Sequence, residues 1–359
     1  MSGRPRFLLV RLSSLGDVAL ATSVVGSLRE SLPGCHLTFL TQPRYAALLE
    51  HHPGLDDLVL APAAPRSAWG WARFGATLRA RRFDVLLDLQ YNWRTLGLAL
   101  GLAPLRVRRW DRAHFARRAL LRDRSRPPLP HMVERLHRAA HPWLAGPPHG
   151  PHVAGGAEAW RAALALLAGW APPEARWLGV VPVARWDTKR WPPERWAELC
   201  RRWTAGAERH ALAFFGPDDA AVRDAFRAAL GPAPRVHLAA EGLGVAAELL
   251  RRMEVVVAGD TGLMQLAVAV GTPTVALFGA TSPAFGFAPY GPNHRAVTLG
   301  LACQPCALHG ALRCPLGHFR CLQDLGVERV EREMAAVAAR RPADSAPAAG
   351  AAAGSGGNP

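Results

Sequence analysis

VVAGDTGLMQLAVAVGTPTVALFG, residues 256–279, is the stretch of this chain that decides its fold. Two apolar runs of strand length, residues 255–258 and 274–278, flank a segment with helical character, residues 263–270. A Gly-Asp-Thr-Gly turn joins the first run to the helix. Strand, turn, helix and strand in this order are typical of a βαβ unit, so the stretch predicts a parallel sheet.

The same alternation extends in both directions along the chain. In the first half, strand-like runs fall at residues 7–12, 36–40, 58–61 and 84–89, with a helix at 17–32 and another at 131–144. In the second half, runs at 178–183, 211–215 and 236–238 alternate with helices at 193–203, 218–230 and 245–252. We therefore predict the α/β class, with two Rossmann-like domains whose open parallel sheets face each other across a cleft.

The length of the chain also favours two domains, because a single core rarely grows beyond about 250–300 residues and this chain has 359. We place an N-terminal domain at residues 1–160 and a C-terminal domain at 161–340, with the linker somewhere in 145–176. Residues 341–359 are rich in Pro, Ala, Gly and Ser, a composition that predicts a disordered tail.

The formal charge of +15 and the pI near 11.1 favour a polyanionic partner, such as nucleic acid, an anionic membrane surface or a phosphorylated substrate. No RNP aromatic motif or zinc-finger spacing is present, so we do not expect nucleic acid. The N-terminus lacks the pattern of a signal peptide, and no apolar run reaches the ~18–20 residues that span a bilayer. We therefore expect a cytoplasmic protein without a transmembrane segment.

The stretch LVRLSSLGDVAL, residues 9–20, places Ser14, Gly16 and Asp17 where a buried strand turns into a helix. Glycine there would let a ligand approach the backbone closely. An ionised Asp17 in the first helical turn, facing the cleft, could act as a general base. Spacing alone equally supports a second interpretation, in which Asp17 only stabilises the start of the helix.

The turn at Asp260 and Thr261 leads into a helix whose first backbone N–H groups belong to Gly262 and Leu263. A helix N-terminus is a favourable seat for phosphate. Asp260 would repel phosphate, so we expect it to bind hydroxyls of a sugar or a ribose. The alternative is an ordinary helix cap formed by Asp260 or Thr261.

Lys189, within RWDTKRWP at residues 185–192, is the only lysine among 43 basic residues. It falls in the loop between a strand and a helix that begins near Pro193, which directs it toward the same cleft. A compact ammonium suits a phosphate group that gains charge as a bond breaks. The alternative is a solvated surface lysine.

Four cysteines lie close together near the C-terminus: Cys303, Cys306, Cys314 and Cys321. A C-x2-C pair followed by two more cysteines has the ligand number and type of a structural Zn²⁺ site, although the x7 and x6 gaps match no common finger. Free thiols packed in a loop are the alternative.

Taken together, RLSSLGDVALATSVVGSLRESLPG, PHMVERLHRAA, DTKRWPPERWAEL and GDTGLMQLAVAVGTPTVALFG resemble the ADP-heptose:lipopolysaccharide heptosyltransferases of glycosyltransferase family 9. The resemblance covers about residues 6–335 and implies a GT-B fold. It implies inverting transfer of a heptose from an ADP-activated sugar, with no metal or other cofactor required. It further implies an anionic lipopolysaccharide-core acceptor and a peripheral location on the cytoplasmic face of the inner membrane, where the arginines of residues 106–126 would lie over the anionic acceptor region.

By position, the resemblance gives Asp17 the role of catalytic base and Lys189 that of binding the donor phosphates. It assigns the donor-binding turn to Asp260, Thr261, Gly262 and Leu263. Gln265 stands where family members often have histidine, which leaves the donor open. Two alternatives therefore remain: a family 9 transferase with another nucleotide sugar or acceptor, and a non-catalytic nucleotide-sugar-binding protein.

Overall fold

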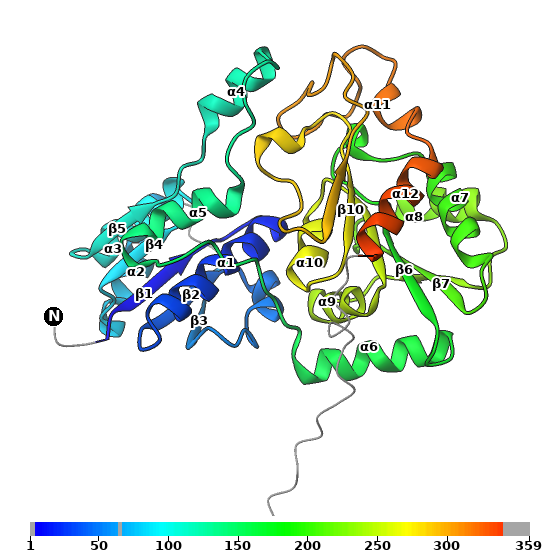
Figure 1. Ribbon diagram of the computed structural model, residues 1–359. Coiled ribbons are helices and arrows are strands. Elements are labelled where there is room, and N and C mark those ends of the chain that lie inside the picture. The colour runs from blue at the N-terminus through cyan, green and yellow to red at the C-terminus, as the bar shows by residue number, and fades with distance from the viewer. Residues whose placement is uncertain (1–3, 64–66, 340–359) are drawn as a thin grey trace, which may run out of the picture.

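The computed structural model describes residues 4–63 and 67–339, and the predicted tail at 341–359 lies outside these ranges. The chain forms two parallel sheets that stand side by side, each with helices packed against it (Figure 1). The predicted α/β class and the division into two sheets are both confirmed.

The first sheet has the strand order β3-β2-β1-β4-β5, and every pairing in it is parallel. Its inner strands are near-continuous apolar runs because both faces of a parallel sheet are covered by helices. In the register of the sheet, Phe7 lies between Leu37 and Val85. The strands are β1 (Arg6–Val10), β2 (His36–Thr41), β3 (Asp57–Leu60), β4 (Val85–Asp88) and β5 (Arg106–Arg109).

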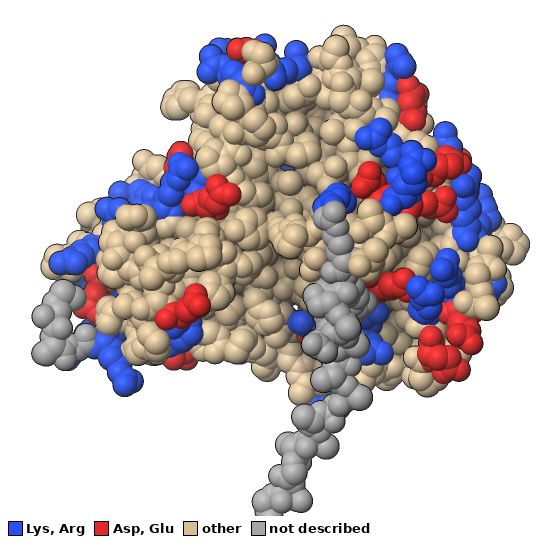
Figure 2. Space-filling view, viewed as in Figure 1, with Lys and Arg blue, Asp and Glu red and all other residues tan. Residues whose placement is uncertain are grey.

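Alternate residues of β1 separate the two helical layers of this half. Phe7 and Leu9 belong to the large core formed with α1 (Leu15–Ser31) and α5 (Met132–Ala140). Leu8 and Val10 belong to a smaller core under α2 (Ala68–Thr77) and α3 (Trp93–Leu102). Helix α4 (His114–Arg122) stands away from the sheet at the end of an excursion, and basic side chains gather at its tip (Figures 1 and 2).

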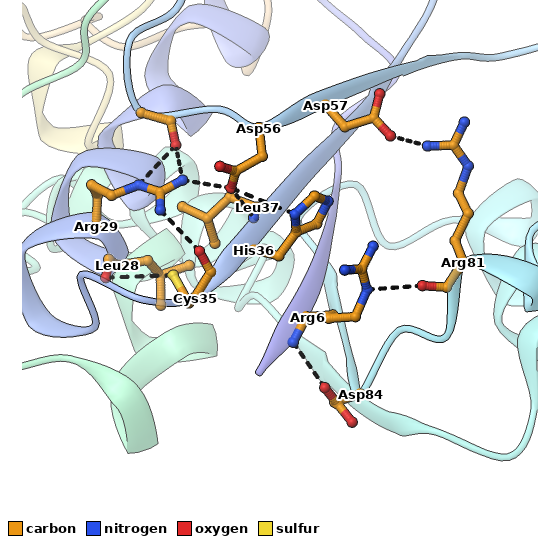
Figure 3. Close-up of polar contacts among 11 residues, drawn as sticks. Arg6, Leu28, Arg29, Cys35, His36, Leu37, Asp56, Asp57, Arg81 and Asp84 are labelled. Atoms are coloured by element: carbon orange, nitrogen blue, oxygen red, sulfur yellow. Dashed lines mark hydrogen bonds and ion pairs between the residues drawn. The ribbon is translucent and has the colours of Figure 1, made fainter. Parts of the chain in front are cut away.

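Ion pairs and hydrogen bonds tie together the amino ends of these strands (Figure 3). Arg29 of α1 pairs with Asp56 at 2.6 Å, and Asp56 also accepts a hydrogen bond from the backbone N–H of Leu37 at 2.7 Å. Arg81 pairs with Asp57 at the start of β3. This network fixes the amino ends of the strands, and the predicted site lies at their carboxyl ends.

The second sheet is also fully parallel, with the order β11-β10-β9-β6-β7-β8. Its strands are β6 (Arg176–Val181), β7 (Arg209–Phe214), β8 (Val236–Ala239), β9 (Val255–Gly259), β10 (Thr274–Leu277) and β11 (His294–Val297). Its helices are α7 (Pro193–Thr204), α8 (Ala220–Leu230), α9 (Leu243–Arg252), α10 (Gly262–Ala269), α11 (Arg320–Gln323) and α12 (Val327–Ala338).

The predicted linker region, residues 145–176, contains helix α6 (Gly156–Trp170), which packs against α9. Before α6, the chain is bonded to both halves: the N–H of His152 donates to Thr22 Oγ1 of α1 at 2.9 Å, and the N–H of Val153 donates to the carbonyl of Ala269 at 3.2 Å. Because residues 160 and 161 both fall inside α6, the exact domain boundary stays a prediction.

Two parts of the first half differ from expectation. The predicted helix at 131–144 ends at Ala140 and continues as a 3-10 turn at His141–Trp143. The arginine-rich stretch after residue 105 contains strand β5, whose exposed guanidinium groups lie at the edge of the sheet. Charged residues are typical of an edge strand, and they remove the apolar pattern by which a strand is predicted.

Candidate functional site

A cleft of about 1330 Å³ lies between the two halves, at the carboxyl ends of the strands. This is the position expected for ligands of open parallel sheets. All nine residues that the sequence predicted for the cleft line it: Ser14, Gly16, Asp17, Lys189, Asp260, Thr261, Gly262, Leu263 and Gln265. The structure thus brings three separate segments of the sequence to one place.

Asp17 lies in the first turn of α1, and its contacts converge on one carboxylate oxygen. Oδ2 accepts hydrogen bonds from the N–H of Ser14 at 3.1 Å and from Ser14 Oγ at 2.9 Å, and it pairs with Arg11 Nη2 at 2.7 Å. Burial raises the pKa of this carboxyl, but the charge of Arg11 and the bonds from Ser14 outweigh burial and bring the pKa below 3.8. Asp17 is therefore an ionised carboxylate that also stabilises the helix start, as the second interpretation of the sequence stated.

The other oxygen of Asp17, Oδ1, receives no hydrogen bond or ion pair from the described residues. The side chain is 23% exposed and lines the cleft. A carboxylate held by one oxygen and free at the other can accept a proton from a bound hydroxyl.

Gly16 lies where the first turn of α1 contacts α10. A Cβ at this position would lie 3.0 Å from Cγ of Gln265 and 3.3 Å from Cα of Gly262. The absent side chain therefore lets the first turns of α1 and α10 meet across the cleft. Gly16 also lines the cleft, so close approach of a ligand to its backbone stays a prediction.

Lys189 ends the 3-10 turn at Asp187–Lys189, and its Nζ forms an ion pair with Asp260 Oδ2 at 2.6 Å. Thr281 Oγ1 donates to the same oxygen at 2.8 Å. The side chains of Lys189 and Asp260 are 13% and 17% exposed, so the pair is largely shielded from water. Lys189 is consequently no surface lysine, and the structure excludes that alternative.

Thr261 caps helix α10, because its Oγ1 accepts a hydrogen bond from the N–H of Met264 at 3.3 Å. The capping alternative is thus correct for Thr261. One hydroxyl satisfies only one of the orphan N–H groups at a helix start, so the groups of Gly262 and Leu263 remain available at the cleft wall.

Gln265 is 4% exposed in the interface between α1 and α10. Its Nε2 donates to the carbonyl of Phe287 at 2.8 Å, whereas its Oε1 is buried without a hydrogen-bond partner among the described residues. An unpaired buried acceptor is costly, so this amide weakens the contact between α1 and α10.

Charge is distributed unequally over the walls of the cleft. The N-terminal half contributes four arginines and one carboxylate: Arg11, Arg44, Arg112, Arg117 and Asp17. The C-terminal half contributes two cations and four carboxylates: Arg185, Lys189, Asp218, Asp219, Glu241 and Asp260. The N-terminal wall therefore carries a net positive charge, which favours an anionic ligand there.

A further arginine, Arg135, lies behind the N-terminal wall and adds to its positive charge. Arg135 is fully buried and forms no ion pair among the residues described, and burial beside Arg117 lowers its pKa to about 10. Its guanidinium donates to the carbonyls of Arg112 and Phe285 and lies over the ring of Trp110. Cations held without a carboxylate partner leave a positive potential for an incoming anion.

The comparisons agree with this geometry. The sequence profile of glycosyltransferase family 9 (heptosyltransferase) matches residues 71–312, which is more than half of the chain. The chain belongs to glycosyltransferase family 9. It is 29% identical to lipopolysaccharide heptosyltransferase 1 of Pseudomonas aeruginosa over 352 residues, which cover 90% of this chain and 92% of that protein. It is 25% identical to lipopolysaccharide heptosyltransferase 1 of Escherichia coli, over 77% of this chain and 89% of that one.

Solved structures of similar proteins establish the fold of this family 9 member as GT-B. The glycosyl transferase family 9 protein of Veillonella parvula superimposes with a TM-score of 0.76 at 21% identity, covering 95% of this chain and 99% of that one. The ADP-heptose lipopolysaccharide heptosyltransferase II of Escherichia coli gives 0.73 at 22% identity, over 93% and 99%. The predicted family, fold and transferase class are confirmed.

The four clustered cysteines of this transferase lie in what we call the cysteine loop, residues 303–321. Burial and the neighbouring thiols raise the pKa of Cys321 to about 11, and Cys303 Sγ lies 3.9 Å from His318 Nε2. Across the part of the chain that the structure describes, no group of three or more His, Cys, Asp or Glu side chains is arranged to hold a metal ion. The zinc site gains no support from this geometry and stays a prediction.

Several cleft residues of the family 9 member escaped the sequence analysis. Arg11 was part of the quoted stretch, but nothing marked it among so many arginines. His309, from the cysteine loop, and Trp110 also line the cleft. Their role depends on tertiary contacts that no local pattern encodes.

Proposed function

We propose that this family 9 transferase moves a heptose from an ADP-sugar to the anionic inner core of lipopolysaccharide, with inversion at the anomeric carbon. The observation that carries the proposal is the placement of Asp17 across one cleft from Lys189 and the start of α10. A base on one wall and cationic groups on the other are what transfer from a nucleotide sugar needs. Escherichia coli relatives of the same fold have been solved with ADP and with ADP-2-deoxy-2-fluoro heptose, which supports the choice of nucleotide.

In the proposed reaction, Oδ1 of Asp17 takes the proton of an acceptor hydroxyl. The hydroxyl oxygen forms its bond to the anomeric carbon as the bond from that carbon to the diphosphate oxygen breaks, and ADP leaves with the electron pair. Because Arg11 and Ser14 hold Oδ2, the carboxylate keeps its orientation while Oδ1 reacts.

Charge accumulates on the diphosphate as the bond breaks. The ammonium of Lys189 has three donor positions, so it can keep its contact with Asp260 and also bind a phosphate oxygen. The free N–H groups of Gly262 and Leu263 supply further donors at a positive helix end. We propose that these groups carry out the stabilisation without a divalent ion, which addition of a chelator to the assay would test.

Asp260 contributes twice in this proposal. Its Oδ2 holds Lys189 and Thr281, and its Oδ1 receives no contact from the described residues, so it can accept from a donor hydroxyl. The arginines of the N-terminal wall would bind the anionic acceptor. An acceptor of this kind is a membrane lipid, which gives the protein its proposed place on the cytoplasmic face of the inner membrane.

Two measurements test the proposal. ADP, UDP and GDP are titrated into wild type and Lys189→Ala by calorimetry, and we expect selective ADP binding that falls about tenfold to a hundredfold in the variant, as for loss of a charged hydrogen bond. Transfer is then measured with Asp17→Asn, for which loss of a general base predicts a decrease of about a hundredfold or more. Asp224→Asn, an exposed carboxylate on α8 outside the cleft, is the matched control.

The outcomes separate the alternatives. A preference for UDP or GDP would move the protein to another nucleotide sugar, as the glutamine at 265 permits. Undiminished transfer by Asp17→Asn would remove the proposed base. ADP binding without transfer to any lipopolysaccharide-core acceptor would leave a nucleotide-sugar-binding protein.

A further inference from the structure

Helix α3 exposes an apolar stripe to solvent. Trp93, Leu96 and Leu100, spaced three and four residues apart, are 45%, 45% and 64% exposed. The opposite side of α3 is buried in the small core through Leu98 and Leu102. Exposed helix faces are normally polar, so a helix that is apolar on both sides indicates that its outer side meets something other than water.

Helix α2 extends this face. A Cβ on Gly97 would overlap the carbonyl oxygen of Ala68, and a Cβ on Gly101 would overlap that of Ala72. The backbones of α2 and α3 are therefore in direct contact and form a flat two-helix layer. Trp69, in the first turn of α2, is 70% exposed.

We call the surface formed by Trp69, Arg73, Tyr91, Trp93, Leu96 and Leu100 the α2–α3 face. The charges of the segment that forms this face are mainly positive. Residues 67–109 contain eight arginines and two aspartates, and both aspartates are engaged internally: Asp84 accepts from the N–H of Arg6, and Asp88 is buried against Tyr91 and Thr95.

Aromatic rings and guanidinium groups lie together at one end of this face. The guanidinium of Arg94 lies 5.4 Å from the ring centre of Trp93, and that of Arg109 lies 5.5 Å from the ring centre of Tyr91. Trp and Tyr favour the boundary between lipid and water, and arginine binds phosphate there.

We propose that the α2–α3 face docks on a phospholipid bilayer that carries anionic headgroups. The leucines and tryptophans would enter the boundary region while the arginines contact lipid phosphates. A second copy of the chain fits less well, because a symmetric contact would bring two arginine-rich faces together. No helix in residues 4–63 or 67–339 is long and apolar enough to cross a bilayer, so docking would be at the surface. The inference rests on the proposed function, since a lipid-linked acceptor must be met at a membrane.

The test is co-sedimentation of the full-length protein with vesicles, without donor or acceptor. We expect wild type to bind vesicles of phosphatidylcholine with phosphatidylglycerol, to bind phosphatidylcholine alone weakly, and to be released by salt. Leu96→Ser with Leu100→Ser should lower the partition coefficient by about tenfold or more. Leu312→Ser with Leu316→Ser, which changes two exposed leucines (65% and 63%) in the cysteine loop, should leave the partition coefficient unchanged.

The proposal is overturned if the Leu96/Leu100 variant binds vesicles as wild type does. It is also overturned if wild type ignores vesicles but forms a dimer that this variant dissociates, since the face would then bind a second copy. ADP titration of the same proteins separates this inference from the proposed function: absent ADP binding would count against the donor assignment alone, whereas normal ADP binding with no vesicle binding would overturn only the docking surface.

Discussion

Arg11 controls the ionisation of the proposed base, and replacing it should move the acid limb of the pH profile. The ion pair from Arg11 Nη2 to Asp17 Oδ2 is 2.7 Å long and largely shielded, with side chains that are 6% and 23% exposed. Burial alone would raise the pKa of Asp17, and the guanidinium is the main influence that reverses this. An opposite charge at such a distance lowers a carboxyl pKa by about 1–3 units, or about 1.4–4 kcal/mol.

The expected result follows from the sign of that shift. A base acts only when deprotonated, so transfer is lost as the pH falls through the pKa of Asp17. In wild type this limb lies at low pH, because the pKa of Asp17 is lowered from its ordinary value. In Arg11→Gln we expect the limb of kcat/KM to lie at a clearly higher pH than in wild type, because the charge that lowers the pKa of Asp17 is removed while burial still raises it.

The assay is ADP release at saturating acceptor, with kcat/KM measured across the pH range for wild type, Arg11→Gln and Arg11→Lys. Arg11→Lys is the matched control, because it keeps the positive charge and should keep the limb near that of wild type. Thermal unfolding of each variant checks that the contacts of Arg11 to Ser13 and Leu89 are not required for folding. Coincident profiles for Arg11→Gln and wild type would refute the reasoning.

Three further predictions concern stability and metal content. Gly16→Ala should lower the free energy of unfolding, measured in urea, by about 1–3 kcal/mol, because its Cβ would crowd Gln265. Gly244→Ala is the control, because its Cβ would make only ordinary van der Waals contacts at 3.5 Å, and we expect no loss of stability. Burial lowers the pKa values of His52 and His294 from 6.5 to about 4, so the unfolded chain takes up protons before the folded chain as the pH falls. Each buried histidine should therefore lower the free energy of unfolding by up to about 3 kcal/mol between pH 6.5 and pH 4. Replacing either histidine by Leu should reduce this dependence of stability on pH. Elemental analysis of protein purified without chelator tests the zinc prediction for the cysteine loop, which fails if no metal is found.

The fold was predictable because its main signal is local. A strand buried on both faces must be an apolar run, so β1, β4, β6 and β9 can be recognised from their own residues alone. Strand β5 was not predictable in this way, because its RVRR sequence lies at a sheet edge and carries exposed charge. Prediction from apolar runs fails where an edge strand carries charge, whereas the edge strands β3 and β8 keep enough apolar residues to be predicted.

In the candidate site, too, the residues with a local sequence signal were predicted, and the contacts that depend on the tertiary structure were not. Asp17, Lys189 and Gly262 were found because each lies in or beside a strand-to-helix connection, which has a recognisable sequence. The contacts between these residues were not predicted, because nothing local links Lys189 to Asp260, or Gly16 to Gln265. Those pairings exist only because the two sheets and two helix starts meet, and a single sequence carries no record of which residues meet.

Hydrogen bonds join the cysteine loop to the segment that carries Lys189. The N–H of Cys306 donates to the carbonyl of Ala280 at 2.9 Å, which anchors the loop beside β10. Farther along, the N–H of Ala311 donates to Thr188 Oγ1 at 2.8 Å, and that hydroxyl donates back to the Ala311 carbonyl at 2.9 Å. Thr188 immediately precedes the lysine, so these bonds fix the backbone from which the ammonium extends toward Asp260. From the other half of the molecule, Arg124 donates to the carbonyls of Cys303 and Pro305. The loop therefore connects the excursion that carries α4 to the residue proposed to hold the donor phosphates.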